Sequence, residues 1–555
     1  MRMSGSTIIV KCLLEQGVDT VFGYPGGAIM PLYDALYDAP IRHILTVHEQ
    51  GAAHAADGYA RSSGKVGVCI STSGPGATNL VTGLATAFMD SSPVVAITGQ
   101  VSTHLLGRDS FQEVDITGIT MPVTKHNFLV KNIEELAETI HLAFAIAASG
   151  RPGPVLIDVP RDILLGETEV TSLKRPAVQL NADYHPEHDD ALKTAAAALT
   201  KARRPIMVIG GGVIAGNACK ELLDFIQSQN IPVASTLMGL GAIDHNNRNF
   251  LGLTGMHGQR AANYAIHNAD LVVAVGTRFS DRVTGDTNSY VSGKTVIQFD
   301  IDASEIDKNI TANIMLISEL RNSLERLAKT LDTRPAQDLN EWWTKIRAWQ
   351  QQYSFKYEQS SLNVPWIARH MSSVRTPVIW VTDVGQHQMW AAQHLHITGH
   401  RSWLTSGGLG TMGFGVPAAM GAQAANPDKR VVLIAGDGGF KMTGMELYTI
   451  AHQQLPVITV IVNNSSLGMV RQWQHLFFNR RYSSTILPQN FDFVGFAASC
   501  GIEAKNVTTA DEFVSAFDWA MSLNSPAVII VNIDPELRVD PMVAPGAPID
   551  QFIES

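Results

Sequence analysis

Residues 431–470 read VVLIAGDGGFKMTGMELYTIAHQQLPVITVIVNNSSLGMV, and this stretch decides the fold. Two short apolar runs, residues 431–435 and 457–462, have the length and β-branched content of buried strands. Between them, residues 444–453 repeat apolar positions at helical spacing. Strand, helix and strand in this order predict a parallel βαβ unit, as in doubly wound α/β domains.

A polar loop follows each of these two strands. The first loop, residues 436–439, reads GDGG, and the second, residues 463–466, reads NNSS. A right-handed crossover brings both loops to the edge of the sheet where open α/β folds bind ligands. Glycines let backbone N–H groups approach a phosphate, while Asp437 and Asn464 offer the hard oxygen ligands that Mg²⁺ prefers. The pair predicts a diphosphate held by magnesium, although Gly-Asp-Gly alone is also a good turn.

The composition is that of a large globular protein. Its 555 residues suffice for three or four domains, and 45% hydrophobic with 17% charged residues can fill large cores. The net charge of −10, without a basic stripe, argues against nucleic acid as a partner.

The cysteines and the N-terminus indicate a cytoplasmic protein. Cys12, Cys69, Cys219 and Cys500 lie far apart without a CxxC pair, which disfavours a disulfide framework or a zinc site. Residues 1–17 have the pattern of an amphipathic helix, with an apolar run too short for a signal peptide. No run of about 18 apolar residues occurs, so we expect no membrane span.

The chain is expected to form three α/β domains, each a doubly wound parallel sheet covered by helices. Their predicted boundaries are residues 1–170, 190–332 and 360–535, followed by a tail over 536–555. Polar or charged stretches at 171–190 and 332–340 separate the domains. The tail contains three more prolines after Pro535 and is expected to run irregularly over the surface.

Apolar runs locate the strands of each domain. We expect strands at residues 20–24, 43–47, 66–71, 94–98 and 155–159, then at 205–209, 233–235, 271–275 and 296–301, and at 378–382 before the two runs above. The first and third domains have similar length and rhythm, which suggests a duplication.

Several long motifs together resemble acetohydroxyacid synthase (acetolactate synthase), specifically its FAD-containing biosynthetic catalytic subunit. The motifs are VFGYPGGAIMPLYDAL (21–36), TSGPGATNLVTGLA (72–85), FQEVD (111–115), RPGPVLIDVPRD (151–162), GMHGQRAANYA (255–265), FSDRVTG (279–285) and LGMVRQWQ (467–474). They span nearly every segment and contain many residues of special backbone geometry, so the agreement is specific. The resemblance implies thiamin diphosphate, Mg²⁺ and FAD as cofactors.

The resemblance implies that the first and third domains form the thiamin diphosphate site. Glu49 matches the carboxylate that activates the aminopyrimidine; from the residues alone it is a charge at a helix N-terminus. Met412 matches the apolar wedge that bends the cofactor, and in isolation it would be a core gap-filler. Asp437, Asn464 and the Ser466 carbonyl match the magnesium ligands. The other matched contacts are Gln386, His387, Gly410, Gly438, Gly439, Leu467, Gly468 and Met469.

The second domain resembles the family's flavin domain. Residues 206–216, IMVIGGGVIAG, read as a strand followed by glycines, which alone is also a structural turn. The RVTG segment at 282–285 is absent from flavin-free catabolic relatives. The family's Gly-Asp is Ser318-Glu319 here, and Ser280 replaces an aspartate, so both changes are expected to weaken flavin binding. The matched flavin contacts are Arg151, Gly210, Gly211, Gly212, Thr236, Leu237, Met238, Gly255, Met256, His257, Gly276, Arg278, Arg282, Asp300, Ile301 and Glu319.

The resemblance also implies two substrate pockets. Gly27, Phe111 and Gln112 match residues beside the reactive carbon; Met256, Arg282 and Trp473 match those that receive the second keto acid. The Arg282 guanidinium is suited to bidentate binding of a carboxylate. Trp473, unless it is an ordinary core residue, offers a flat wall for an ethyl group, so 2-ketobutyrate is expected to be preferred over pyruvate as acceptor. Arg161 stands where the family has a lysine, which leaves its role open.

The expected reaction is decarboxylation of pyruvate on thiamin diphosphate, with transfer of the two-carbon unit to pyruvate or 2-ketobutyrate. This is the first common step of valine, leucine and isoleucine biosynthesis. No net oxidation occurs, so FAD is expected to be non-redox. The resemblance further implies an obligate homodimer or larger homo-oligomer, with Glu49 and Asp437 from different subunits, and a small regulatory subunit. Alternatives are a flavin-dependent pyruvate oxidase, another thiamin carboligase, and a non-catalytic nucleotide-binding regulator.

Overall fold

The structure, a computed structural model, describes residues 2–170, 173, 188–331, 338–355 and 362–553. The chain folds into two compact units. Unit 1 comprises Met1–Leu180, Val378–His387 and Leu404–Asn532, and unit 2 comprises Asn181–Pro377, Gln388–Trp403 and Ile533–Ser555. The expected first and third domains thus share unit 1. The exact domain boundaries given above remain predictions, and the two expected linkers lie largely outside the described residues.

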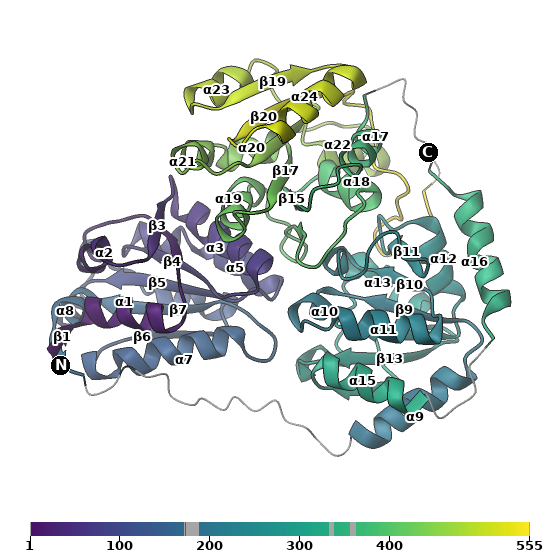
Figure 1. Cartoon of the computed structure of the whole chain (residues 1–555), viewed down its shortest axis with the longest axis horizontal. Helices are drawn as coiled ribbons and strands as arrows, with labels where there is room; N and C mark the ends of the chain where they lie inside the picture. The colour runs from purple at the N-terminus through teal and green to yellow at the C-terminus, as the bar shows by residue number, and fades with distance from the viewer. Residues whose placement is uncertain (1, 171–172, 174–187, 332–337, 356–361, 554–555) are drawn as a thin grey trace. The chain divides into compact units, whose positions relative to one another are not determined.

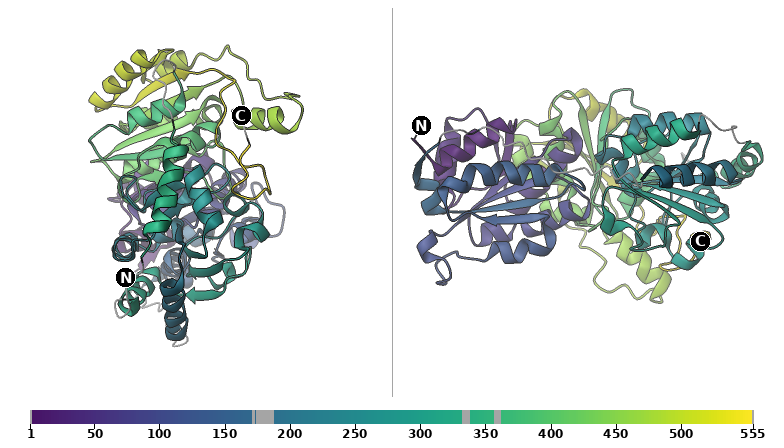
Figure 2. Two further views of the ribbon diagram at one scale, coloured as in Figure 1. Left: turned by 90° about the vertical axis from the view of Figure 1, so that its right-hand side faces the viewer. Right: turned by 90° about the horizontal axis from the view of Figure 1, so that it is seen from below.

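The N-terminal sheet of unit 1 is parallel, with strand order β3-β2-β4-β5-β7-β6. Its strands are β2 (Thr20–Gly23), β3 (Arg42–Leu45), β4 (Gly67–Ser71), β5 (Val94–Gln100), β6 (His126–Leu129) and β7 (Val155–Pro160). Its helices are α1 (Gly5–Glu15), α2 (Met30–Tyr37), α3 (Glu49–Ser63), α4 (Pro75–Thr78), α5 (Val81–Met89), α6 (Ile116–Thr120), α7 (Leu136–Ala148) and α8 (Arg161–Leu165). Helices cover both faces of the sheet (Figures 1 and 2), so its central strands are buried throughout.

The C-terminal sheet of unit 1 has strand order β16-β15-β17-β18-β20-β19. Its strands are β15 (Val378–Thr382), β16 (Trp403–Leu404), β17 (Arg430–Gly436), β18 (Ile458–Asn463), β19 (Glu503–Val507) and β20 (Ala527–Asn532). Its helices are α19 (Gly415–Ala425), α20 (Asp437–Thr443), α21 (Glu446–His452), α22 (Gly468–Phe477), α23 (Phe493–Ser499) and α24 (Ala510–Ser522). The helix after β15, α18 (Gln386–His394), begins in unit 1, but its residues beyond His387 belong to unit 2. The crossover from β17 to β18 is the predicted βαβ unit, confirmed as a parallel pair.

The two sheets of unit 1 are joined by the small-residue helices α3 and α19. A Cβ atom added at Gly58 would lie 2.2 Å from the Ala418 carbonyl oxygen, and one at Gly421 would lie 1.9 Å from that of Ala55. Only glycine permits so close an approach of two helix backbones. One continuous apolar core therefore spans both sheets.

Unit 2 contains the third parallel sheet, with strand order β11-β10-β9-β12-β13-β14. Its strands are β9 (Pro205–Ile209), β10 (Val233–Ser235), β11 (Phe250–Leu253), β12 (Leu271–Val275), β13 (Thr295–Asp300) and β14 (Ile314–Ile317). Its helices are α9 (His188–Lys201), α10 (Gly211–Ala215), α11 (Cys219–Gln229), α12 (Arg260–Asn268), α13 (Asp281–Thr284), α14 (Thr287–Val291), α15 (Leu320–Leu331), α16 (Asn340–Gln352) and α17 (Val364–Met371). Three doubly wound parallel sheets thus confirm the predicted fold class.

The C-terminal tail does not run over the surface as expected. It is irregular, but Val539, Met542 and Val543 are buried, and Val543 N donates to the Met256 carbonyl at 2.8 Å. The Asn263 amide donates to the Ile549 carbonyl at 2.7 Å. Apolar side chains between its prolines therefore pack against unit 2, which proline content alone does not reveal.

The expected strands are all present, and their ends differ from the predicted ones by at most two residues. The expected helix at 444–453 is wrong in its extent, because α20 already begins at Asp437 and the helical run is interrupted at Gly444 and Met445. We did not predict β20, although it is a buried apolar run, or the partly polar edge strands β6 and β19. The strands β11, β14 and β16 and the short antiparallel pair of β1 (Arg2–Ser4) with β8 (Glu167–Glu169) were also not predicted. Over the described residues, no helix is both long and apolar enough to cross a membrane.

Candidate active site

Three adjacent strands of the C-terminal sheet end at one edge with polar residues. β15 and β18 both pair with β17, so the residues after these strands come together. Because β16 pairs on the far side of β15, the strand order reverses between β15 and β17. Open α/β sheets bind ligands at such a reversal. The segments that meet there begin at Asp383, Asp437 and Asn464.

Glycines bring these segments into close contact. A Cβ atom added at Gly436 would lie 2.8 Å from His387 Nδ1, and one at Gly468 would lie 2.1 Å from Gln386 Oε1. At Gly438, the same atom would lie 2.7 Å from the Leu467 side chain and 3.6 Å from Met412 Cε. The structure thus brings together residues from all four segments that we predicted to contact the cofactor.

Several buried polar atoms in this cluster have no hydrogen-bond partner among the described residues. They are Asp437 Oδ2, His387 Nε2 and the Ser466 hydroxyl. Burial raises the pKa of Asp437 to about 6, against the lowering effect of Lys441, and burial lowers the pKa of His387 to about 4. Unpaired polar atoms are rare in protein interiors, so their presence in one place indicates a polar ligand.

The Asn464 amide is held by a chain of side chains. Its Nδ2 donates to Gln386 Oε1 at 3.1 Å, and Gln386 Nε2 donates to Gln472 Oε1 at 2.9 Å. In this orientation Asn464 Oδ1 accepts from the Ser466 N–H at 3.1 Å. Among the described residues, no cluster of three His, Cys, Asp or Glu side chains could hold a metal ion. A cation here would depend on one carboxylate with amide, carbonyl and phosphate oxygens, which is a donor set suited to Mg²⁺.

The loop over residues 405–413, which we call the glycine loop, carries Gly410 and Met412. Gly410 has a positive φ of 70°, and a side chain there would meet open space. The end of the loop is held by Asp383, which accepts from Gly413 N at 3.0 and 3.1 Å and from Gly415 N at 3.2 Å. We did not single out Asp383 from the sequence, although it directly follows an apolar strand, as a ligand-binding acid would.

The predicted N-terminal site residues gather around the loop after β4. A Cβ atom at Gly76 would lie 3.4 Å from Glu49 Oε1, and one at Gly74 would lie 2.9 Å from the Gln112 side chain. Gly27 is next to Ala28, whose N–H donates to Thr72 in the same loop. The Glu49 carboxylate accepts from Asn79 Nδ2 at 2.9 Å. Phe111, by contrast, is 88% exposed.

Glu446, at the start of α21, was not predicted and holds the segment before Glu49. Its carboxylate accepts from Val47 N at 3.1 Å and from His48 N at 3.2 Å, and it also accepts from Thr449. Burial raises the pKa of Glu446 to about 7. An acid at the first turn of α3 complements the helix dipole, so Glu446 positions the turn that contains Glu49.

In unit 2, the predicted flavin residues form two clusters at the carboxyl edge of the sheet. A Cβ atom at Gly210 would lie 2.2 Å from the Gly276 carbonyl oxygen, and one at Gly212 would lie 2.7 Å from Gly276 Cα. A Cβ atom at Gly211 would lie 3.1 Å from Met238 Cβ. These loops follow β9, β10 and β12, where the strand order reverses, so a ligand backbone can approach closely.

The second cluster in unit 2 centres on the loop after β11. Met256 N donates to the Arg282 carbonyl at 2.8 Å, and Asn263 binds both the N–H and the carbonyl of Gly255. His257 is buried, and burial with the nearby Arg282 charge lowers its pKa to about 4. The Arg282 guanidinium is largely exposed and pairs with Asp281 at 2.7 Å.

The remaining predicted residues lie at strand ends or helix starts. In unit 2, Asp300 is buried at the end of β13 and its carbonyl accepts from Ser318 N, which precedes the exposed Glu319. Also in unit 2 are Thr236, Leu237, Arg278 and Ile301. In unit 1, Arg151 donates to the Ser91 hydroxyl, Met469 lies in the first turn of α22, and Trp473 is half-buried on α22 with its ring edge-on to Phe477.

Comparison with known proteins covers the whole chain. The models for thiamine pyrophosphate enzymes match it at residues 3–119 (N-terminal TPP binding domain), 192–327 (central domain) and 383–531 (C-terminal TPP binding domain). The chain is 46% identical over 556 residues to the acetolactate synthase isozyme 2 large subunit of Escherichia coli, covering all of both chains. It is 44% identical over 574 residues to a probable acetolactate synthase large subunit of Methanocaldococcus jannaschii, covering 100% of this chain and 95% of that protein.

The raised pKa of Glu446 predicts a pH-dependent stability. The carboxyl group has a higher pKa in the folded than in the unfolded chain, so its contribution is fully present below pH about 4.5 and is lost as pH rises through about 7. The Glu446→Gln variant should lack this loss, and the difference in unfolding free energy across the window should be on the order of 3 kcal/mol. Urea unfolding of both proteins at several pH values measures it. Parallel pH curves would show that Glu446 does not titrate in this range.

Proposed function

The chain belongs to the acetolactate synthase large subunits within the thiamine pyrophosphate enzymes, and from this membership we propose how its residues divide the work of the reaction. The enzyme decarboxylates pyruvate and transfers the two-carbon unit to a second 2-keto acid. Thiamin diphosphate, when bound, supplies the carbon nucleophile and accepts the electrons left by the departing CO₂. The protein contributes orientation, charge stabilisation and proton transfer.

Magnesium and the diphosphate are proposed to occupy the edge of the C-terminal sheet. Asp437, Asn464 and the Ser466 carbonyl would hold the ion, while Gln386, His387 and the N–H groups near Gly438 and Gly468 bind the diphosphate oxygens. The observation that supports this proposal is the buried, unpaired Asp437 Oδ2 beside His387 Nε2 and the Ser466 hydroxyl. A dication next to Asp437 would stabilise its charged form, which burial disfavours.

Glu49 is proposed to exchange a proton with the aminopyrimidine ring, which requires a second copy of the chain. In this arrangement, Glu49 of one subunit would complete the Asp437 site of another. Exposed apolar side chains of unit 1 support an interface between copies. Phe111 is 88% exposed, and Met442 on α20, Met445 between α20 and α21, and Tyr448 on α21 are 59%, 55% and 58% exposed. A residue lining a pocket beside the reactive carbon must be covered, so Phe111 needs a partner chain.

FAD is proposed to bind unit 2 at the two glycine-rich clusters, without reduction during turnover. The supporting observation is the close approach of Gly210 and Gly212 to Gly276, which leaves backbone rather than side chains at the edge of the sheet. Ser280 and Glu319 are expected to weaken the binding.

For the second keto acid, we propose that Arg282 binds the carboxylate and that Trp473 and Met256 contact the side chain. The Arg282 guanidinium is largely exposed and pairs with the exposed carboxylate of its neighbour Asp281. Exposed ion pairs are weak, so a substrate carboxylate can replace Asp281 as the partner. The name "large subunit" of the relatives supports a small regulatory partner.

A product assay tests the proposal as a whole. Purified protein with Mg²⁺, thiamin diphosphate and FAD should form acetolactate from pyruvate while the flavin spectrum stays oxidised. Flavin bleaching in step with pyruvate consumption would instead identify a pyruvate oxidase. Acetolactate formation without added or retained FAD would contradict only the proposal that the enzyme uses FAD.

Replacing Glu49 tests its role in proton transfer. Glu49→Gln keeps the size and the hydrogen bond from Asn79 but removes the ionisable group, so turnover should fall by about 100-fold or more. Calorimetric titration should show thiamin diphosphate still bound. Glu134→Gln, an exposed acid in the same sheet domain, serves as the control. Near-normal turnover would remove Glu49 from the mechanism.

Replacing Asp437 tests the proposed magnesium site formed by Asp437, Asn464 and the Ser466 carbonyl, which we call the clamp. Asp437→Ala removes the only carboxylate of the donor set, so magnesium-dependent binding of thiamin diphosphate should weaken by roughly 100-fold or more. The control is Asp511→Ala, which removes an exposed acid from the first turn of α24. Equal affinities in Asp437→Ala and in the control, measured with and without Mg²⁺, would refute the clamp.

Replacing Trp473 tests acceptor preference. Trp473→Leu removes the flat wall, so preference for 2-ketobutyrate over pyruvate should fall by about tenfold, the value of a methylene contact. The two acceptors compete in one reaction, and the ratio of products is measured. Trp519→Leu, at another half-buried tryptophan, should keep the ratio. An unchanged ratio in Trp473→Leu would assign acceptor choice elsewhere.

A further inference from the structure

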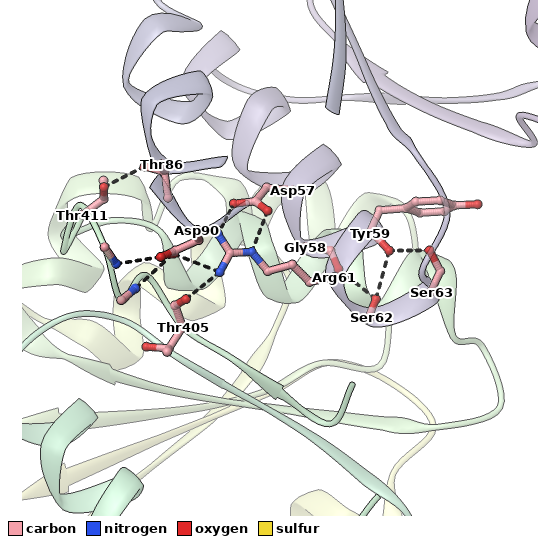
Figure 3. Close-up of polar contacts among 12 residues, drawn as sticks. Asp57, Gly58, Tyr59, Arg61, Ser62, Ser63, Thr86, Asp90, Thr405 and Thr411 are labelled. Atoms are coloured by element: carbon pink, nitrogen blue, oxygen red, sulfur yellow. Dashed lines mark hydrogen bonds and ion pairs between the residues drawn. The ribbon is translucent and has the colours of Figure 1, made fainter. Parts of the chain in front are cut away.

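A buried charge network connects the N-terminal sheet domain to the glycine loop of the same chain (Figure 3). Arg61, on α3, pairs with Asp57 through two hydrogen bonds of 2.6 and 2.7 Å. Its third nitrogen reaches Asp90 Oδ2 at 3.1 Å and the Thr405 carbonyl at 2.8 Å. The side chains of Asp57 and Asp90 are fully buried, and that of Arg61 is 10% exposed.

Asp90 binds the start of the glycine loop directly. It lies at the C-terminal end of α5 and accepts from Gly407 N at 3.0 Å and from Gly408 N. A Cβ atom added at Gly408 would lie 2.9 Å from both Asp90 Oδ1 and the Met89 side chain, so the loop is pressed against this helix end. Two backbone N–H groups and one guanidinium thus share a single buried carboxylate.

The middle of the glycine loop has a second contact with α5. The hydroxyls of Thr86 and Thr411 are 2.7 Å apart, and Thr411 N donates to Ser406 within the loop. At the far end, Asp383 and Thr443 bind Gly413. Gly410 and Met412 therefore lie between anchors on both sides. The backbone torsions that aim the Gly410 carbonyl are set by groups that do not touch the cofactor themselves.

We propose that Asp90, oriented by Arg61 and supported by Thr86, is a positioning residue that fixes the glycine loop so that Gly410 and Met412 are presented to the aminopyrimidine half of thiamin diphosphate. This inference rests on the proposed roles of Gly410 and Met412. Its consequence is that the N-terminal sheet domain positions the glycine loop of its own chain through Asp90, in addition to supplying Glu49. Asp90 acts only on the loop, so the diphosphate clamp should be independent of it.

Two ligands distinguish an effect on the glycine loop from an effect on the diphosphate site. In Asp90→Asn, one loop N–H or the guanidinium loses its acceptor, so the affinity for thiamin diphosphate should fall by about tenfold. The affinity for inorganic pyrophosphate with Mg²⁺, which uses only the clamp, should stay within about twofold. Both are measured by calorimetry on the full-length protein. The control is Asp19→Asn, because Asp19 also pairs with an α3 residue, Tyr59, but not with the loop.

A second readout needs no ligand. Amide hydrogen exchange in the cofactor-free Asp90→Asn protein should quicken by about tenfold over residues 405–413 and remain unchanged over β17. Thr86→Val, a milder change, should produce the same pattern more weakly, and Thr86→Ser should restore the wild-type rate. These threonine variants decide the question if Asp90→Asn does not fold.

Unchanged exchange in the glycine loop would overturn the proposal, and so would an equal loss of affinity for both ligands. The outcomes are distinct from a failure of the proposed function. If the wild-type protein binds no thiamin diphosphate and forms no acetolactate, the function itself is wrong. If it does both while Asp90→Asn and Thr86→Val match it, only the positioning role of Asp90 fails.

Discussion

A buried carboxylate oxygen without a protein partner is the constraint on which the C-terminal sheet depends. Asp437 Oδ2 lies at the end of β17, where burial disfavours its charge and no described group donates to it. Such an atom is strongly unfavourable unless a ligand compensates. The neighbouring segments add the unpaired His387 Nε2 and Ser466 hydroxyl, and the proposed magnesium diphosphate would offer polar partners to these atoms.

The rest of unit 1 holds the segments around this point. Close packing of α3 against α19 joins the two sheets into a single core. In addition, two buried acids accept hydrogen bonds from loops that contain candidate site residues or lie next to them. Glu446, from the C-terminal half, binds the turn before Glu49; Asp90, from the N-terminal half, binds the glycine loop. Each half therefore positions a loop that belongs to the other, so either half alone would lack one of these two anchors.

Unit 2 uses the same kind of parallel sheet for the proposed flavin site. Its glycine loops approach each other at the reversal of strand order, and the buried tail supports the segment that contains Met256. The three sheets share one rule: residues after adjacent parallel strands meet, while helices on both faces keep the strands apolar. Which ligand each sheet can bind then depends on the loop residues: glycines let a ligand approach the backbone, and unpaired polar atoms offer it hydrogen bonds or metal contacts.

The fold class and most strands, including β15, β17 and β18 at the candidate site, were predictable from the sequence, because apolar runs and glycine-rich loops report local geometry. Others, such as β11, β20 and the partly polar edge strands β6 and β19, were not predicted. Asp437 and Asn464 were recognisable since each directly follows a buried strand. Asp383 also directly follows a buried strand, so the same signal could have identified it. Glu446 and Asp90 carry no such signal, because their backbone partners lie 399 and 317 positions away in the chain. Their roles arise only when the fold brings backbone N–H groups to a buried carboxylate, and the burial of the tail has the same origin. Local patterns specify what each segment can form, whereas tertiary packing decides which acid each loop depends on.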